Sequence, residues 1–288
     1  MKSRIEVSNL KKQYGNNVVL KGISFKVEEG SIFALLGTNG AGKTTTLECI
    51  EGLRKYNSGE IYIDGKIGVQ LQSSSLPESI RGIEALKLFA KWNNTAVDME
   101  FAERLGLKEI MKKEYKSMST GQKRRLHLAL AMTGNPDIVF LDEPTAGLDV
   151  EGRVALHEEI RRLKAMGKTI IMASHDMAEV ESLCDGLAIL KDGEIAFIGT
   201  VNELTAKMTK TYSIHVKLER TLTKDKIKLS LYKGEEKGYH IFESNKIDDG
   251  LLELLTLSKE EGVIVKDIKI ENKTLEDSFM DIARGEEE

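Results

Sequence analysis

Cysteine, proline and tryptophan are scarce in this sequence, which has two, three and one of them among its 288 residues. The two cysteines, Cys49 and Cys184, lack partners at the spacing of metal ligands, so we expect reduced core thiols of a cytoplasmic protein. The sequence also lacks the run of about 18 apolar residues that a membrane-spanning helix needs. Its first residues lack the apolar segment of a signal peptide, which again indicates a cytoplasmic chain.

Neither sign of charge dominates, because 42 basic residues face 46 acidic ones and leave a formal net charge of −4. Proteins that bind nucleic acid usually carry a strong basic excess, so we expect no nucleic-acid ligand. The content of 41% hydrophobic and 31% charged residues is that of an ordinary soluble globular protein. The length allows one large domain and a small one.

What the sequence does have is a glycine-rich segment at 37–44 that matches the P-loop pattern Gly-x-x-x-x-Gly-Lys-Ser/Thr. The apolar run 31–36 predicts a strand before it, and 45–50 predicts the first turns of a helix. In that context the backbone N–H groups and the helix N-terminus bind phosphates, Lys43 reaches the β- and γ-phosphates, and Thr44 ligates Mg²⁺. The predicted nucleotide contacts are Asn39, Gly40, Ala41, Gly42, Lys43, Thr44 and Thr45.

Strands and helices alternate up to about residue 200. An apolar strand at 138–141, an amphipathic helix at 154–166 and a strand at 169–173 predict a mainly parallel α/β core. Helical periodicity at 80–115 predicts a helical insert. Further strands are predicted at 5–7, 18–20, 23–27 and 60–63, with a hairpin around Asp192 and Gly193.

The pattern changes after a break at 200–211, and apolar residues then alternate with polar ones. Such alternation is typical of half-buried strands in a small α+β domain. We predict strands at 212–218, 227–231, 239–242 and 263–270, a helix at 251–257 and a closing helix at 274–282. The predicted domains are therefore 1–205, with its helical insert at about 76–120, and 206–288.

Two adjacent acids, Asp142 and Glu143, follow the apolar strand at 138–141. A carboxylate at the carboxyl end of a strand beside the P-loop strand can hold Mg²⁺. The second acid can then accept a proton from a water molecule in line with the γ-phosphate. An ordinary strand end followed by a turn has the same appearance, so the acid pair by itself leaves both interpretations open.

Further motifs remove this ambiguity. Residues 141–149, LDEPTAGLD, resemble the Walker B motif and D-loop of ATP-binding cassette (ABC) ATPases, and 118–125, MSTGQKRR, resemble the family's signature motif. Residues 173–176, ASHD, resemble its switch-histidine segment. Gln72 falls at the position of the Q-loop glutamine, although neighbouring Gln70 is an alternative, and Tyr14 falls at the adenine-stacking aromatic. The motifs occur in the family's order.

The resemblance covers about residues 3–200 and implies an α/β P-loop NTPase fold of the ABC type. That fold has a mainly parallel sheet, an N-terminal antiparallel β subdomain and a helical insert, followed here by the small α+β domain. The resemblance implies ATP and Mg²⁺ as cofactors. Its implied catalytic residues are Glu143, His175 and Gln72, its metal ligands are Thr44, Gln72 and Asp142, and its further ATP contacts are Tyr14, Ser119, Gly121, Gln122 and Asp149.

The signature motif departs from the family's usual Leu-Ser-Gly-Gly-Gln, because Met118 replaces leucine and Thr120 replaces the first glycine. The side chain of Thr120 adds a Cβ that could narrow the approach of the backbone to a phosphate. His127 and His157 lie in predicted helices without a motif, and we interpret them as ordinary structural histidines.

The resemblance also implies partners. In this family the signature of one subunit closes on the ATP held by the P-loop of another, so we expect a head-to-tail dimer with a second copy or a paralogous ATPase subunit. A transporter further requires a separate polytopic membrane permease, with this chain on the inner face of the cell membrane. Residues 272–280, NKTLEDSFM, resemble the closing segment of bacterial drug, antibiotic or polysaccharide exporter ATPases.

The alternative within the family is a soluble ABC ATPase that is not coupled to transport, such as a regulatory or translation-associated protein. Ribosome-associated members usually carry two cassettes, whereas this chain has a single P-loop. Chromosome and repair ATPases insert a long coiled coil between the Walker motifs, and no sustained heptads occur here. A monomeric P-loop kinase or GTPase would leave the signature and Gln72 unexplained.

Overall fold

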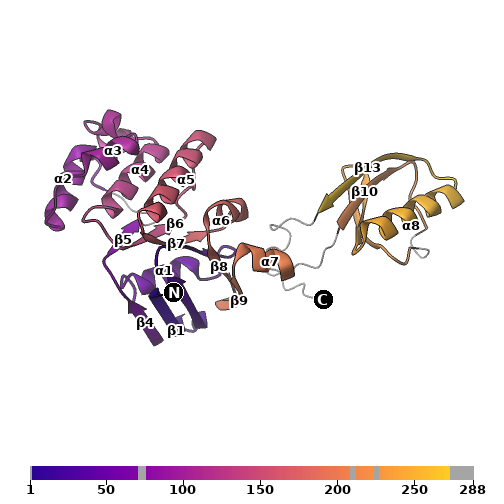
Figure 1. Cartoon of the computed structure of the whole chain (residues 1–288), viewed down its shortest axis with the longest axis horizontal. Coiled ribbons are helices and arrows are strands. Elements are labelled where there is room, and N and C mark those ends of the chain that lie inside the picture. Colours follow the sequence, from indigo (N-terminus) through magenta and orange to yellow (C-terminus); the bar gives the residue numbers. More distant parts are fainter. Residues whose placement is uncertain (1, 71–75, 208–211, 224–226, 273–288) are drawn as a thin grey trace. The chain divides into compact units, whose positions relative to one another are not determined.

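The computed structural model describes residues 2–70, 76–207, 212–223 and 227–272, which divide into two compact units (Figure 1). The N-terminal unit ends at Val201, and the C-terminal unit begins at Asn202. None of the helices in these ranges is long and apolar enough to cross a membrane.

A six-stranded sheet forms the centre of the described N-terminal unit, in the order β5-β6-β7-β3-β8-β9. All neighbours are parallel except β8 and β9. Strands β3, β6 and β7 are buried at every position, because helices or a second sheet cover both faces. The strands are β3 (Ile32–Leu36), β5 (Ile67–Gln70), β6 (Ile138–Asp142), β7 (Thr169–Ser174), β8 (Gly186–Lys191) and β9 (Glu194–Gly199).

Helices and a second sheet enclose this parallel core. Helices α5 (Val150–Ala165) and α6 (Met177–Leu183) lie on one side of it, and α1 (Lys43–Ile50) lies on the other (Figure 1). On the α1 side the antiparallel sheet β2-β1-β4 adds its apolar face. Its strands are β1 (Ser3–Tyr14), β2 (Asn17–Glu28) and β4 (Ser58–Ile63).

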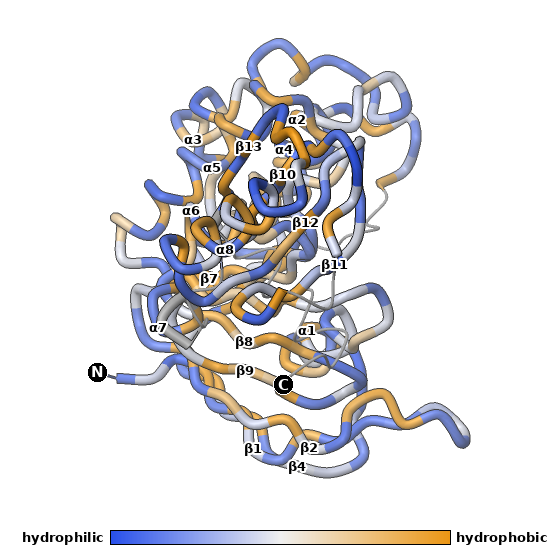
Figure 2. Tube along the Cα trace, turned by 90° about the vertical axis from the view of Figure 1, so that its right-hand side faces the viewer, coloured by the Kyte–Doolittle hydropathy of each residue, from blue (hydrophilic) through white to orange (hydrophobic). Residues whose placement is uncertain are grey.

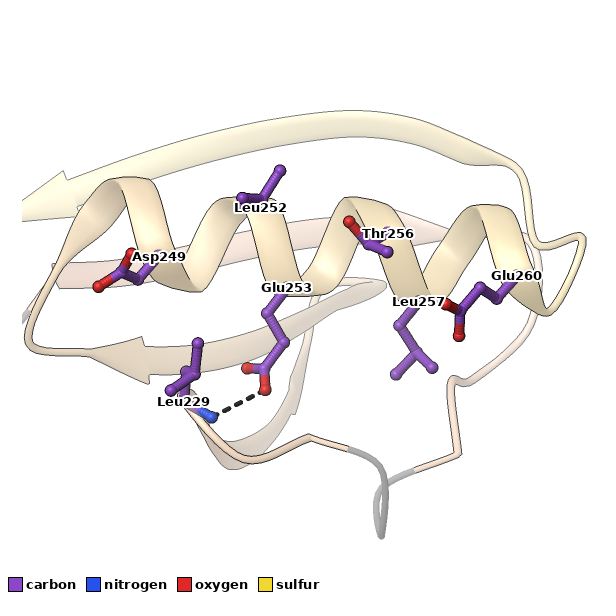
Figure 3. A pocket seen from close by; sticks show the side chains of 7 residues that line it. All are labelled: Leu229, Asp249, Leu252, Glu253, Thr256, Leu257 and Glu260. Atoms are coloured by element: carbon purple, nitrogen blue, oxygen red, sulfur yellow. Dashed lines mark hydrogen bonds between the residues drawn. The ribbon is translucent and has the colours of Figure 1, made fainter.

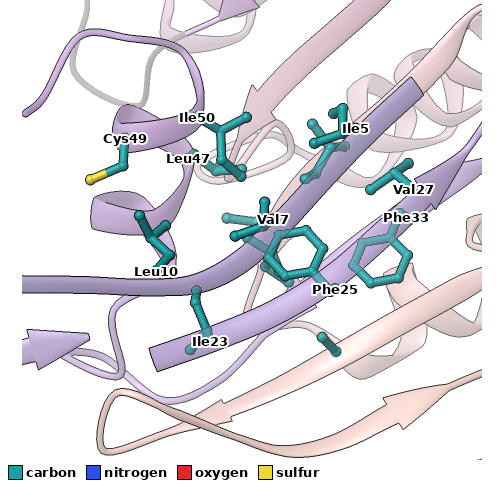
Figure 4. Packing of buried hydrophobic residues seen from close by; sticks show 14 of the residues in the cluster. Ile5, Val7, Leu10, Ile23, Phe25, Val27, Phe33, Leu47, Cys49 and Ile50 are labelled. Carbon is teal, nitrogen blue, oxygen red and sulfur yellow. The ribbon is translucent and has the colours of Figure 1, made fainter. Parts of the chain in front are cut away.

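The core between these layers is aromatic at its centre. The rings of Phe25 and Phe33 stack with centroids 5.5 Å apart, next to Ile5, Val7 and Leu47 (Figure 4). The hydropathy colours of Figure 2 show β8 as a largely hydrophobic strand. Burial of this apolar surface is the main force that fixes the P-loop strand against the β1–β2 hairpin.

The predicted strands at 18–20 and 23–27 are parts of the single strand β2, so the prediction of two short strands is wrong. Leu10 pairs with Ile23 and Lys11 pairs with Lys21, which leaves Gly22 unpaired in a β-bulge. The φ of Gly22 is 113°, a conformation that favours glycine. The bulge interrupts the alternation of buried and exposed side chains that would have indicated one continuous strand.

The predicted helical insert consists of short helices around a small apolar core. Helix α2 (Gly82–Trp92) and helix α4 (Thr120–Ala131) contact each other, and α3 (Met99–Arg104) contributes the buried Phe101. Two 3₁₀ turns, Lys108–Ile110 and Tyr115–Ser117, connect α3 to α4. The signature segment therefore lies where the predicted insert, which ends at about 120, meets the start of α4.

The C-terminal unit is an antiparallel sheet in the order β11-β12-β10-β13 with helix α8 on one face. Ile214, Phe242 and Leu254 are in its apolar cluster. Its described elements are α7 (Val201–Lys207) from its second residue onward, β10 (Tyr212–Leu218), β11 (Leu231–Glu236), β12 (Tyr239–Ser244), α8 (Ile247–Glu260) and β13 (Val265–Asn272). The predicted closing helix at 274–282 lies outside the described residues.

The strand predicted at 227–231 is wrong, because β11 begins only at Leu231. The carboxylate of Glu253 on α8 accepts a hydrogen bond of 2.8 Å from the backbone N–H of Leu229 (Figure 3). It accepts another, of 2.6 Å, from the backbone N–H of Lys228. A side chain thus binds the N–H groups that a neighbouring strand would otherwise bind.

Candidate nucleotide-binding site

The glycine-rich segment joins β3 to α1, as its pattern predicts. Gly42 precedes α1 with a φ of 107°, and Gly40 has a φ of 86°. A Cβ on Gly42 would lie 2.7 Å from Cδ2 of Leu20, so this position requires glycine for both conformation and space. The loop can therefore curl its N–H groups toward an anion at the start of the helix.

Lys43 is the first residue of α1 and is buried, with 5% of its surface exposed. Its Nζ donates hydrogen bonds to the carbonyl oxygens of Gly37 at 2.7 Å and Thr38 at 3.2 Å. Burial lowers the pKa of the Lys43 ammonium, and the charges of Glu143 and Asp142 oppose that shift. An anionic ligand would supply the charge partner that a buried ammonium needs.

Asp142 is the last residue of β6 and is buried, with 4% exposed. Its Oδ1 is buried without a hydrogen-bond donor among the described residues. Burial raises the pKa of the Asp142 carboxyl, while a hydrogen bond from the Thr44 side chain opposes this. A buried oxygen in need of a partner, beside a threonine hydroxyl, suits Mg²⁺, which prefers oxygen ligands. The residues present therefore fit the metal.

Glu143 and His175 meet at the carboxyl ends of neighbouring strands. Nδ1 of His175 lies 3.2 Å from Oε1 of Glu143. Glu143 has a φ of 47° and donates its N–H to the carbonyl oxygen of Ala173 at 3.0 Å. This left-handed conformation, rare for glutamate, is the kind of strain that functional sites retain. The side chain of Glu143 is 14% exposed and that of His175 is 58% exposed, so the pair opens to solvent.

The signature segment begins helix α4. Ser119 is the N-cap, and its Oγ accepts from the N–H of Gln122 at 3.3 Å. Oε1 of Gln122 accepts in return from the N–H of Ser119 at 3.1 Å and from Nζ of Lys113 at 3.0 Å. This capping box gives Ser119 and Gln122 a role within the chain itself. Thr120 is the first helical residue, so its Cβ is compatible with the local backbone.

The D-loop lies against the start of α4. A Cβ on Gly147 would be 3.2 Å from Cγ2 of Thr120, and one on Gly121 would be 3.3 Å from Cδ2 of Leu148. Asp149 is the N-cap of α5, and its Oδ1 accepts from the N–H of Gly152 at 2.8 Å. Signature and D-loop therefore form one contiguous surface.

Tyr14 ends β1 and is 40% exposed. Nζ of Lys12 lies 4.5 Å from the ring centroid and Cζ of Arg54 lies 5.5 Å from it. Arg54 is itself paired with Glu48 through a contact of 2.5 Å between Nε and Oε2. An exposed ring beside two cations suits a stacked purine next to a charged phosphate chain.

The structure brings one set of predicted residues together through hydrogen bonds or charge effects: Lys43, Thr44, Asp142, Glu143 and His175. Ser119, Gly121 and Gln122 form another set, beside the D-loop that ends at Asp149. Gln72 lies outside the described residues, whereas its neighbour Gln70 ends β5 with a buried amide.

Sequence reasoning missed Arg124 in helix α4. Its Nη1 lies 3.4 Å from the carbonyl oxygen of Asp142, and burial lowers its pKa against the charges of Glu143 and Asp142. The run Lys123-Arg124-Arg125 was the available signal, but helical spacing alone does not tell which of the three faces β6. His127, interpreted from the sequence as structural, lies 2.9 Å from the hydroxyl of Tyr115, and burial lowers its pKa to about 4.

The fold and the site together define a P-loop nucleotide-binding domain with a signature surface, which is the surface formed by the signature segment 118–125 and the D-loop that ends at Asp149. Residues 20–146 match the profile of the ABC transporter family. The chain is 37% identical over 214 residues to an uncharacterized ABC transporter ATP-binding protein of Methanocaldococcus jannaschii, which covers 72% of this chain and 82% of that protein. It is 35% identical over 222 residues to the linearmycin resistance ATP-binding protein of Bacillus subtilis, covering 71% of each.

A third relative is the spermidine/putrescine import ATP-binding protein of Mycoplasma mycoides, 36% identical over 218 residues, with 69% of this chain and 62% of that protein covered. Among solved structures, an ATP-binding subunit of an ABC transporter has a TM-score of 0.65 at 29% identity and covers 71% of this chain and 93% of that one. The chain belongs to the family of ABC transporter ATP-binding proteins, and its fold is the ABC cassette.

Proposed function

We propose that this ABC transporter ATP-binding subunit lies on the inner face of the cell membrane, where it hydrolyses Mg-ATP to drive a separate polytopic permease. The observation that carries the proposal is the pair formed by Glu143 and His175, next to the phosphate loop and the buried Asp142. In this arrangement Glu143 can accept a proton from water, and His175 supplies a second polar group near the phosphate loop and its Lys43.

Each residue then has a definite task. The loop N–H groups and Lys43 bind the β- and γ-phosphates, and the ring of Tyr14 stacks on the adenine. Thr44, Asp142 and Gln72 hold Mg²⁺, which neutralises phosphate charge when bound. Glu143 accepts the proton of the attacking water, and His175 contacts the γ-phosphate.

We further propose that the site is completed by a second copy of the chain, or by a paralogous subunit. Thr120 and Gly121 lie close to the D-loop. Thr44 instead hydrogen-bonds Asp142, and Lys43 feels the charges of Asp142 and Glu143. A head-to-tail dimer would lay the signature surface of one chain on the phosphate loop of the other, so that ATP binding favours the closed state.

The direction of transport is proposed as export, and residues 206–288 as an accessory domain. The resemblance of residues 272–280 to exporter ATPases and the linearmycin resistance relative support export. The polyamine import relative supports the opposite direction. The alternative of a soluble ATPase without a permease is tested by affinity purification from membranes of the source cells. Recovery of ribosomes in place of a polytopic membrane protein would favour that alternative.

The substitution Glu143→Gln tests the hydrolytic site. It removes the proton acceptor while keeping the shape, so we expect at least about a hundredfold lower kcat. ATP binding should persist, and ATP should convert the variant to a dimer in light-scattering chromatography. Glu158→Gln on the exposed face of α5 is the matched control. Hydrolysis by Glu143→Gln at the control's rate would refute the role of Glu143.

A further inference from the structure

We infer that Glu179 is a positioning residue that holds the switch histidine, His175, against Glu143. This inference rests on the proposed hydrolytic function. Glu179 belongs to α6 and is 2% exposed, although it follows a solvent-exposed loop. Burying a carboxylate costs folding free energy unless several hydrogen-bond donors surround it. The partners of Glu179 therefore indicate its role.

Those partners lie on both sides of His175. Oε2 of Glu179 accepts a hydrogen bond of 2.6 Å from the Oγ of Ser174, the residue just before His175. The same Oγ accepts from the N–H of Asp176 at 3.1 Å. Oδ1 of Asp176 then accepts from the N–H of Glu179 at 3.1 Å. Glu179 is therefore bonded to the side chain of Ser174, which precedes His175, and through that hydroxyl to the backbone N–H of Asp176, which follows it.

Helix α5 anchors this cluster from the other direction. Nε2 of His157 lies 3.3 Å from Oε1 of Glu179. Nη1 of Arg153 donates to Oδ2 of Asp176 at 2.9 Å. The D-loop residue Asp149 is the N-cap of α5, so the loop that carries His175 is bonded to the helix that follows the D-loop. Loss of Glu179 should release His175 from the position in which its Nδ1 meets Glu143 at 3.2 Å.

The test compares Glu179→Ala, Glu179→Gln and Ser174→Ala with Glu181→Ala, an exposed position of the same helix. Glu179→Ala should lower kcat by about tenfold or more, as misplacement of a reacting group does, while the KM for ATP changes by less than about twofold. Glu179→Gln should recover most of that loss, because its amide oxygen still accepts from Ser174. Ser174→Ala removes the same hydrogen bond with less risk to folding.

A double-mutant cycle separates positioning from general support of the fold. If Glu179 acts through His175, adding Glu179→Ala to His175→Ala should leave kcat unchanged within about twofold. Effects that multiply in full, or a kcat of Glu179→Ala equal to that of Glu181→Ala, would overturn the inference.

A second readout does not depend on hydrolysis. The chain has five histidines, so isotope labelling can resolve the His175 ring signal by NMR. Ser174→Ala and Glu179→Ala should shift that signal and leave His215 of the C-terminal unit unchanged. An unchanged His175 signal would overturn the inference. If the wild-type chain failed to hydrolyse ATP, the proposed function would fail while this measurement still tested Glu179.

Discussion

The two units of the chain bury different kinds of polar groups. Among the described residues, the buried lysines and acids lie in the N-terminal unit, and they are Lys43, Asp142, Glu159, Lys168 and Glu179. The buried polar residues of the C-terminal unit are Ser230, His240, Ser244 and Ser258. A buried charge costs folding energy and persists where partners or a ligand compensate for it. The contrast therefore assigns the chemistry to the N-terminal unit.

The strands of the two units also differ in how completely their side chains are buried. Strand β6 is buried at every position, whereas β12 is buried at alternate positions. A parallel strand covered on both faces ends at an edge where ligands bind, and there β6 carries Asp142. The buried side chains of β12 are His240, Phe242 and Ser244, none of which is a lysine or an acid.

The largest expected effect separates the units by stability. Phe242 is 2% exposed in the core of the C-terminal unit, 5.3 Å from the ring of Tyr232. Phe242→Ala should cost about 3 to 5 kcal/mol of that unit's unfolding free energy, measured by urea denaturation and circular dichroism. ATP affinity should stay within about twofold. The exposed Leu252→Ala on α8 is the control, and a large loss of ATP affinity in Phe242→Ala would break the comparison.

The next effect separates the units by ligand binding. Lys43→Ala should weaken ATP binding by about 10- to 100-fold, the range of a charge-assisted contact. Its apo stability should not fall, because the burial that lowers the pKa of Lys43 already disfavours the ammonium. Calorimetric titration with ATP and thermal melts measure both, with the exposed Lys87→Ala as control. Equal ATP affinity in the two variants would contradict the assignment.

The smallest effect concerns pH. Burial, with the charges of Asp142 and Glu48, raises the pKa of the Glu51 carboxyl to about 8 from an ordinary 4.5. Between these values the folded chain binds the proton more tightly than the unfolded chain, so this group's contribution to stability falls as pH rises from about 4.5 to 8. Glu51→Gln should remove that dependence and add about 1 to 2 kcal/mol at pH 8.5.

Trp92, the one tryptophan of the sequence, ends α2 with its ring 5.3 Å from that of Phe89, so its fluorescence should change when this contact is lost on unfolding of the N-terminal unit. Urea titrations of Glu51→Gln at pH 5 and pH 8.5 therefore measure the relevant unit. The exposed Glu60→Gln is the control. A wild-type stability that does not decline relative to Glu51→Gln over this range would show that Glu51 ionises normally.

The sequence predicts the phosphate loop well, because a motif of fixed spacing between a strand and a helix depends on local structure. It also predicts that Asp142 and Glu143 follow the buried run at 138–141, and the observed strand β6 includes Asp142 as its last residue. It does not predict the left-handed φ of Glu143, since glutamate rarely adopts that conformation and the residue type carries no signal for it.

Contacts between residues that lie far apart in the sequence are also not predicted by the sequence pattern. In the sequence nothing distinguishes Glu179 from other polar helix residues, because its burial against Ser174 and His157 depends on how α5 and α6 pack. The capping box of Ser119 and Gln122 has a local sequence signature. The family resemblance assigns both residues to ATP contacts, so their role as a helix cap was not predicted.

The two cysteines have a practical consequence. Cys49 is 2% exposed, and Sγ of Cys184 lies 3.7 Å from Sδ of Met172. Burial raises the pKa of both thiols, so neither forms the reactive thiolate readily. A cysteine introduced at an exposed position, such as Val150 beside the D-loop, would then be the thiol that maleimide dyes label. Fluorescence energy transfer between two labelled copies would then follow closure of the proposed dimer in a chain that keeps both native cysteines.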